Sequence, residues 1–365
     1  HWSAVPEPLG KYISPSGEDQ MMLEDESGRL RLIGTPLLNE MLVTGCIVAV
    51  MGTENANGDF DVVDIRVADL PPQPRRWDGS DPPKAEKSGE DNDVDMETNS
   101  TGGRKKIAIV SGLGFSGKDS GHSLQLDLLS EFLLGESHSP TIQSEASHIN
   151  RLIIAGNSIS NNADTISDAP NGNARKINKK YGYDSSAYNP APTAHFDSFL
   201  STLLPSIPVT LIPGATDPAN ISMPQQPIHS AMFPSARAYE AGPATEGEPT
   251  QHGWFDPVTN PWAGEVEGWK VLGTGGQNVD DVFKYVETEK RINIMEAMCR
   301  WRCCAPTAPD TLLGSQPQFE TSVIEGPEGQ MVRLIAVPRF EETGEVVLVD
   351  TETLDTSIVK FVVPG

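Results

Sequence analysis

The stretch Ile107-Ala108-Ile109-Val110-Ser111-Gly112 determines how the larger part of this 365-residue chain is interpreted. A short run of small and β-branched apolar residues that ends at a glycine is typical of a strand buried in a parallel sheet. Similar runs occupy residues 151–157 and 208–214, and segments with helical periodicity precede them at 123–134 and 193–204. The alternation of helix and strand predicts an α/β sandwich that begins at residue 106.

Further regular elements are expected toward the C-terminus. The apolar runs and their spacing predict a fourth strand at 269–273, one long helix at 279–304, and late strands at 332–338, 346–350 and 357–363.

The N-terminal residues 1–76 have a different pattern, with short strand-like stretches and no clear helical periodicity. A hairpin is predicted at 21–32, where Glu26-Ser27-Gly28 supplies the turn. Strands are expected at 41–52 and 60–68. Several short strands with glycine-containing turns predict a small OB-type barrel, which we expect to pack on the α/β sandwich.

Segments poor in large apolar residues separate and interrupt these two parts. Residues 77–105 are rich in charged and small residues and cannot bury enough surface to offset the entropy lost on ordering. They are predicted to be a flexible acidic linker, and 161–190 a long disordered loop. The expected organisation is an OB-fold domain at 1–76, the linker, and an α/β domain at 106–365.

The overall charge restricts the kinds of partner. The chain has 51 acidic and 27 basic residues and a net charge of −24. Such a charge disfavours broad binding to nucleic-acid phosphates and favours basic protein partners. No apolar run is long enough to span a membrane and no signal peptide is visible, so no membrane association is expected. The four cysteines (46, 299, 303 and 304) form neither a disulfide framework nor a zinc motif, and we expect them to be buried and reduced.

Polar loops follow three of the predicted strands, at 111–114, 155–158 and 213–217. Because the carboxyl ends of parallel strands meet at one edge of a sheet, these loops are expected to lie together. Their order resembles that of calcineurin-like metallophosphoesterases, which place Asp, Asn and His residues at successive strand ends to hold two metal ions. In this chain the corresponding positions hold Gly112, Asn157, Ala215, Thr216, Asp217, Cys303 and Ser315.

The residues at these positions predict a degenerate site. One carboxylate, that of Asp217, remains and no histidine does, whereas two metal ions need several carboxylates and imidazoles. We therefore expect no catalytic, metal-binding or cofactor-binding residues, and a structural role for Asp217 as an acceptor of backbone hydrogen bonds. Residues 112–117 also fit the glycine pattern of a dinucleotide site, but Asn157 stands where the next strand should end in an acid. A tight turn is the favoured interpretation.

Several strings carry a closer resemblance. The most specific are P-Q-Q-P at 224–227 and P-T-A-P-D-T-L at 306–312. With other stretches these strings resemble the B-subunit family of eukaryotic DNA polymerases, and within it the small subunits of polymerase delta. Relatives carry a further stretch after the second string, whereas here Leu312-Leu313 runs directly into Gly314. The other stretches that carry the resemblance are 23–29, 42–45, 68–70, 110–114, 213–220 and 272–281.

The resemblance implies a non-catalytic scaffold subunit that acts in DNA replication in the nucleus. Such a subunit bridges the C-terminal metal or iron–sulfur domain of the polymerase delta catalytic subunit to the N-terminal domain of a third subunit. The third subunit binds the sliding clamp, so contact with the clamp is indirect. The resemblance implies no cofactor of its own and little direct DNA binding.

Two other functions are compatible with the predicted fold. One is an active metal-dependent phosphoesterase or nuclease, which bound metal would reveal. The other is nucleic-acid binding through the barrel, which the few aromatic residues and several acids of residues 1–77 disfavour. We also expect the two domains to pack against each other as one platform, with Trp77 at their junction.

Overall fold

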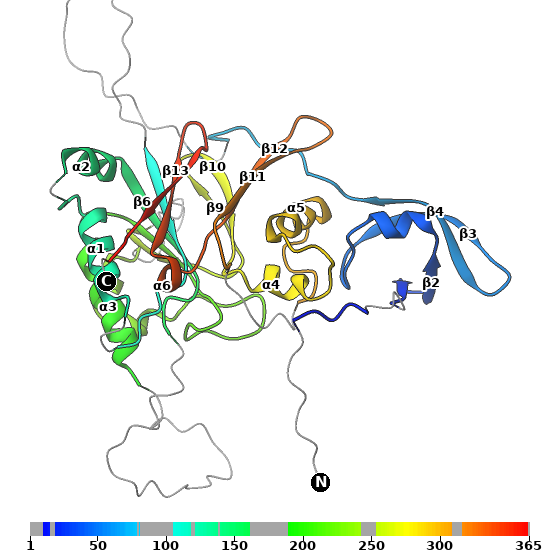
Figure 1. Cartoon of the computed structure of the whole chain (residues 1–365), viewed down its shortest axis with the longest axis horizontal. Coiled ribbons are helices and arrows are strands. Elements are labelled where there is room, and N and C mark those ends of the chain that lie inside the picture. The colour runs from blue at the N-terminus through cyan, green and yellow to red at the C-terminus, as the bar shows by residue number, and fades with distance from the viewer. Residues whose placement is uncertain are drawn as a thin grey trace, which may run out of the picture.

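The computed structural model describes residues 10–14, 19–78, 80, 105–117, 121–137, 139–160, 189–241, 253–308 and 316–363. The predicted linker and the predicted long loop therefore lie outside the described residues, apart from their ends. In the ranges described, the structure has no helix long and apolar enough to cross a membrane. Figure 1 shows a larger mixed α/β body and a smaller N-terminal sheet, with the helices α4 and α5 between them.

Four strands form the N-terminal sheet, in the order β1-β2-β4-β3. β2 and β4 run parallel, and the other neighbours run antiparallel. One face of the sheet buries Leu32, Val62 and Ile65 against Leu37 of the 3-10 turn η1 (Thr35–Asn39). The strands are β1 (Met21–Glu24), β2 (Arg29–Ile33), β3 (Val48–Glu54) and β4 (Asp59–Val67).

The predicted hairpin at 21–32 is confirmed as β1 and β2. In its turn, Asp25 Oδ1 accepts hydrogen bonds from the N–H groups of Ser27 (2.7 Å) and Gly28 (3.0 Å). The strand expected at 41–52 begins only at Val48. The preceding residues, 44–45, form a turn that packs against the larger body.

A six-stranded sheet in the order β14-β13-β5-β6-β7-β8 is the centre of the larger body. The strands from β5 to β8 run parallel, and β13 and β14 continue the sheet antiparallel. The predicted strands at 107–112, 151–157, 208–214, 346–350 and 357–363 are all present. Their bounds are β5 (Lys106–Val110), β6 (Ile149–Ala155), β7 (Val209–Ile212), β8 (Phe255–Pro257), β13 (Glu345–Asp350) and β14 (Thr356–Lys360).

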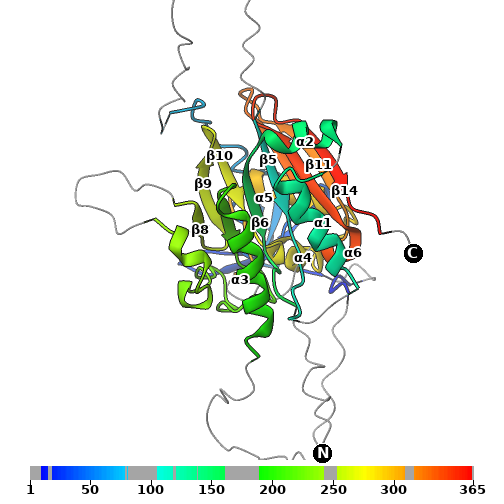
Figure 2. The same cartoon turned by 90° about the vertical axis from the view of Figure 1, so that its left-hand side faces the viewer.

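Helices cover one face of this sheet and hairpins cover the other. On the helical side, α3 buries Phe196, Leu200 and Leu203, as its periodicity predicts. Figure 2 shows α1 and α3 in front of the sheet. On the opposite face, Trp262 and Ile335 of two hairpins pack on the sheet. These elements are α1 (Ser123–Leu133), α2 (Pro140–Ser147), α3 (Ala191–Leu203), β9 (Trp262–Val266), β10 (Trp269–Gly273), β11 (Glu320–Glu325) and β12 (Met331–Ala336).

One prediction for the C-terminal part was wrong. The long helix expected at 279–304 is two helices, α4 (Gln277–Phe283) and α5 (Arg291–Trp301), because the chain turns between them to bring both apolar faces into one cluster. The strand expected at 269–273 is confirmed as β10, which forms a hairpin with β9. The strands β8, β9 and β11 were not expected. The remaining short elements are η4 (Ser230–Met232), η5 (Ala236–Tyr239) and α6 (Phe340–Thr343).

Candidate functional site

The loops that follow β5, β6 and β7 meet at one edge of the six-stranded sheet, as the parallel order of these strands requires. The N–H of Gly112 donates to the carbonyl of Gly156 (2.9 Å), and the N–H of Gly156 donates to that of Ile212 (3.0 Å). A side chain on Gly214 would collide with the backbone of Asn157. The strand-end loops are therefore in direct backbone contact, and they carry the predicted positions 112, 157, 215, 216 and 217.

Asn157 connects the second of these loops to the third. Its backbone has φ +55°, a left-handed conformation that asparagine tolerates better than most residues. Its Oδ1 accepts hydrogen bonds from the backbone N–H (3.2 Å) and the hydroxyl (3.3 Å) of Thr216. The amide that stands in place of a metal-bridging carboxylate thus has partners within the protein.

Asp217 connects the same loops from the other side. Its Oδ2 accepts from the N–H of Gly214 (2.7 Å) and its Oδ1 from the N–H of Ile159 (3.0 Å). Burial raises the pKa of Asp217 to about 6, although hydrogen bonds from the backbone N–H groups of Gly214, Ile159, Ser158 and Asn157 lower it. The carboxylate therefore accepts from backbone donors on two loops, as a structural residue in a turn would.

Three buried amide side chains, which the sequence did not single out, complete this edge. Asn260 Nδ2 has three acceptors within hydrogen-bonding distance for its two hydrogens: Gln225 Oε1 (2.7 Å), Gln277 Oε1 (2.9 Å) and the carbonyl oxygen of Pro213 (3.0 Å). Gln277 Nε2 donates to Gln225 Oε1 (2.9 Å), and Gln225 Nε2 donates to the carbonyl of Gly214 (3.2 Å). All three are at most 2% exposed. The first glutamine of the P-Q-Q-P string is Gln225, so that string was the available signal.

The glycines of the first loop allow α6 to approach closely. Gly112 and Gly114 have φ of +64° and +63°. A side chain on Gly112 would press on Arg339, and one on Gly114 would collide with the carboxylate of Glu341. The N–H of Glu341 also donates to the carbonyl of Gly112 (3.0 Å). Packing explains these glycines, in agreement with a tight turn.

Of the last two predicted positions, Cys303 is not part of this group. Cys303 lies beside Met298 and Cys46, in the apolar cluster between the two bodies, and Ser315 is outside the described residues. All four cysteines are free and partly buried rather than fully buried. Burial raises the pKa of the Cys46, Cys299 and Cys304 thiols. Among the described residues, no group of three or more His, Cys, Asp or Glu could hold a metal ion.

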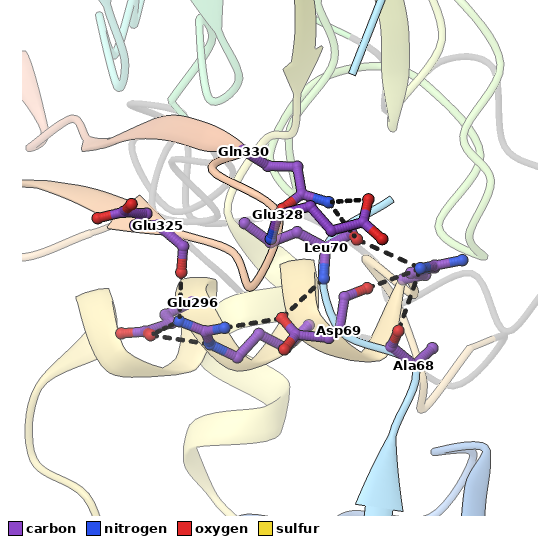
Figure 3. Close-up of polar contacts among 9 residues, drawn as sticks. Ala68, Asp69, Leu70, Glu296, Glu325, Glu328 and Gln330 are labelled. Atoms are coloured by element: carbon purple, nitrogen blue, oxygen red, sulfur yellow. Dashed lines mark hydrogen bonds and ion pairs between the residues drawn. The ribbon is translucent and has the colours of Figure 1, made fainter. Parts of the chain in front are cut away.

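A second cluster of polar contacts joins the two bodies. Arg302 directly follows α5 and reaches the end of β4, where its Nε donates to the carbonyl of Asp69 (2.7 Å). Its Nη2 donates to the carbonyls of Ala68 (3.1 Å) and Leu70 (3.3 Å). One guanidinium thus binds three successive backbone carbonyls of the other body. Figure 3 shows these carbonyls beside α5 and the β11–β12 hairpin.

Arg300 extends the same cluster. It forms ion pairs with Asp69 (2.7 Å) and with Glu296 on the preceding turn of α5 (2.8 Å). Gln330, in the β11–β12 hairpin, donates to the carbonyl of Leu70 (3.4 Å). Because the Arg300 side chain is 29% exposed, we expect each ion pair to contribute little to stability. The main effect of the pairs is to fix how α5 lies against residue 69.

An apolar cluster lies between the bodies next to these polar contacts. Val282, Ile294 and Met298 of α4 and α5 are buried, and Val43 and Val67 of the N-terminal part pack against them. Residues 70, 324 and 334 form a second buried group beside it. The two bodies therefore share a continuous interface.

Trp77, expected at the junction of the two domains, instead packs on the β9–β10 hairpin and is not among the residues of the interface at α4 and α5. The backbone N–H of Trp77 donates to the carbonyl of Gly268 (3.2 Å), and the indole ring occupies the space that a side chain on Gly268 would need. Arg76 stacks near the rings of Trp77 and Trp269, at 5.4 and 5.0 Å, and pairs with Glu352 (2.8 Å). Trp77 thus fixes the chain to the β9–β10 turn, while α4 and α5 form the main interface.

Comparison with known proteins identifies the family. The family model for the B-subunit of DNA polymerases alpha and epsilon matches residues 107–327, and that of the DNA polymerase delta subunit OB-fold domain matches residues 1–65. The DNA polymerase delta small subunit of Arabidopsis thaliana is 32% identical, over 94% of this chain and 73% of the relative. The chain belongs to the DNA polymerase delta small-subunit family.

Other members of this family agree. The DNA polymerase delta small subunit of Saccharomyces cerevisiae is 31% identical, over 94% of this chain and 71% of the relative. DNA polymerase delta subunit 2 of Drosophila melanogaster is 30% identical, over 97% of this chain and 76% of the relative. The predicted resemblance is confirmed, and the chain is a regulatory subunit of a replicative DNA polymerase.

Proposed function

We propose that the chain is a non-catalytic scaffold of polymerase delta. The observation that carries this proposal is the edge of the six-stranded sheet, where Asp217 and Asn157 accept hydrogen bonds from neighbouring loops. A metal-dependent phosphoesterase needs such oxygens for its metal ions. Here they hold the loops together, so the fold serves as a rigid support.

The proposed domains follow the predicted boundaries. We infer an OB-type barrel at 1–76, a linker at 77–105 and an inactive calcineurin-like phosphoesterase sandwich at 106–365. The positions 112, 157, 215, 216, 217 and 315 are the inferred remnants of its metal site, and Cys303 is not counted among them because it lies in the apolar cluster at α4 and α5. The shared interface at α4 and α5 supports this view, because it makes the two domains one platform.

The proposed partners are the other chains of the polymerase. The C-terminal metal or iron–sulfur domain of the catalytic subunit would bind one side of the platform, and the N-terminal domain of the third subunit another. Contact with the sliding clamp would pass through the third subunit, and contact with DNA through the catalytic subunit. The site of action would be the nucleus.

Co-purification tests the scaffold directly. The full chain is expressed with the catalytic subunit's C-terminal domain, with the third subunit's N-terminal domain, or with both. We expect both to be retained together through this chain, and not to bind each other without it. Retention of only one partner would contradict a bridging role.

The alternative is an active phosphoesterase, for which the surviving carboxylate of Asp217 is the one favourable observation. Metal analysis of the purified chain and hydrolysis of bis(p-nitrophenyl) phosphate with added manganese separate the two. Two bound metal ions, together with a hydrolytic turnover that Asp217→Asn abolishes, would show that the chain is an enzyme and would contradict the proposed non-catalytic role.

A further inference from the structure

The strand β3 is an unpaired edge of the N-terminal sheet. It pairs with β4 on one side, and in the part of the chain that the structure describes no strand pairs with its other side. Figure 1 shows β3 and β4 at the opposite end of the molecule from helices α1, α2 and α3. With seven residues, β3 is long enough to pair with another strand along its length.

The outer face of this edge is apolar. Ile47, Met51 and Val63 are 80%, 61% and 66% exposed. Val48 and Val50 point the other way and pack on the small core of the sheet. The register shifts at Met51, where the pairing passes from Asp64 to Val62 and leaves Val63 as the extra residue of a bulge. The three exposed side chains are therefore not needed for the sheet's own core.

The residues around this apolar face are acidic. Between residues 48 and 67 there are four carboxylates, at 54, 59, 61 and 64, and one basic side chain, Arg66. Over residues 19–70 there are ten acids, three arginines and no lysine. Proteins commonly protect an exposed edge with lysine or proline, and β3 has neither. An edge that is apolar and acidic is open to a basic strand.

We propose that the β3 edge binds an extended segment of a partner protein in which apolar side chains alternate with lysine or arginine. The segment would add a strand beside β3, with its apolar side chains against Ile47 and Met51 and its basic side chains on the opposite face, toward the carboxylate of Glu54. This inference rests on the proposed scaffold function, since it names the kind of contact by which a further polymerase chain is held.

Two other occupants fit less well. A second copy of this chain would bring the same four carboxylates to the same edge, and like charges there repel. Single-stranded nucleic acid needs basic side chains and exposed aromatic rings, and Arg66 already pairs with Asp64 (3.1 Å). Charge complementarity therefore favours a basic peptide segment.

Peptide binding to the full chain tests the proposal. The probes are labelled seven-residue peptides, the length of β3, that alternate valine with lysine or valine with glutamate, and a third with the lysines grouped at one end. We expect only the alternating lysine peptide to bind well, and the double variant Ile47→Ser/Met51→Ser to weaken its binding by about tenfold or more. Leu124→Ser, at a residue 50% exposed on α1, is the matched control and should change binding less than about twofold.

Hydrogen exchange of the complex identifies the contact. Strand addition should slow exchange of backbone amides within residues 48–54, and not merely within the acidic hairpin as a whole. Equal binding of the grouped and alternating peptides, or unchanged exchange in β3, would overturn the proposal. So would self-association of the chain that the double variant abolishes, because a second copy would then be the occupant.

The same variant separates this inference from the scaffold function. If the double variant still bridges both polymerase partners and still binds the alternating peptide, the edge is not the contact while the scaffold function stands. If the unmodified chain binds the peptide but bridges no partner, the scaffold function fails instead. Loss of both peptide binding and one bridged partner in the double variant would support both.

Discussion

Arg302 holds the end of β4 through three backbone carbonyls that the N-terminal sheet does not use itself. We expect Arg302→Ala to lower the free energy of unfolding by about 1 to 2 kcal/mol, because these carbonyls lose a charged donor at the domain interface. Arg302→Lys should recover part of the loss, since an ammonium group is a point donor and cannot span three carbonyls. Urea unfolding of the full chain measures the change.

Arg66→Ala is the matched control for this prediction. Arg66 is exposed and pairs only locally, with Asp64 on the same strand (3.1 Å), so its loss should change stability by less than about 0.5 kcal/mol. If Arg302→Ala were equally mild, the carbonyl contacts would have no structural importance.

Asp217 is expected to make stability depend on pH. Its pKa in the folded chain, about 6, lies above the ordinary value of 3.8, so the folded state binds the proton more tightly than the unfolded state does. This contribution is fully present below about pH 3.8 and is lost as the pH rises through about 6. Across this titration the free energy of unfolding of the wild type should fall by on the order of 2 to 3 kcal/mol.

The variant Asp217→Asn lacks this proton. It should be less stable than the wild type by about 1 to 3 kcal/mol near pH 5, because its amide group faces backbone N–H donors. The difference between the two proteins should shrink as the pH is raised toward about 7. Thermal unfolding across this range measures it, and polymerase activity of the assembled complex should stay nearly unchanged. A constant difference would show that the folded pKa is not raised.

At the scale of elements, the turn at Gly45 and the pair α4 and α5 set how the bodies meet. Gly45 has φ +96°, and a side chain there would collide with the carbonyl oxygen of Pro306. Gly58 has φ +82°, but a side chain there would meet nothing within 4 Å. The two glycines therefore share a backbone conformation and differ in their surroundings.

This difference allows a paired experiment. Both Gly45→Ala and Gly58→Ala should cost about 1 kcal/mol for the left-handed backbone. Gly45→Ala should cost about 1 to 3 kcal/mol more, since the domain interface must open to admit the methyl group. Denaturant unfolding of both variants gives the comparison. Equal losses of unfolding free energy in the two variants would mean that the turn and Pro306 can move apart without destabilising the protein.

At the scale of the whole molecule, the net charge of −24 should increase the rate at which the chain associates with a basic partner protein. For the proposed partner, the C-terminal domain of the catalytic subunit, we expect the on-rate to fall by about tenfold or more from low to physiological salt, while the off-rate changes little. Stopped-flow or surface-binding kinetics across a salt series measures both rates. A constant on-rate would mean that the charge has no steering role and serves solubility alone.

The local sequence pattern was sufficient to predict those elements in which the burial of each residue follows from its position in the element. The strands β5, β6 and β7 were predicted because burial on both faces makes them short continuous apolar runs, and the helices α1 and α3 because their buried apolar residues recur with the helical period. The degenerate metal site at the strand ends stays a prediction, because it rests on residue type at positions along the chain.

Only the tertiary structure decided the features whose partners are distant in sequence. Arg302 meets carbonyls 232 to 234 residues away, and Gln225 and Asn260 from two loops come together with Gln277 from the first turn of α4. A buried amide or a hydrogen-bonded arginine leaves no repeating pattern in the sequence. Its contribution to stability depends on one specific partner, and not on a face that several residues share. For the same reason the break between α4 and α5 was missed: both halves are helical by local pattern, and packing against the N-terminal domain separates them.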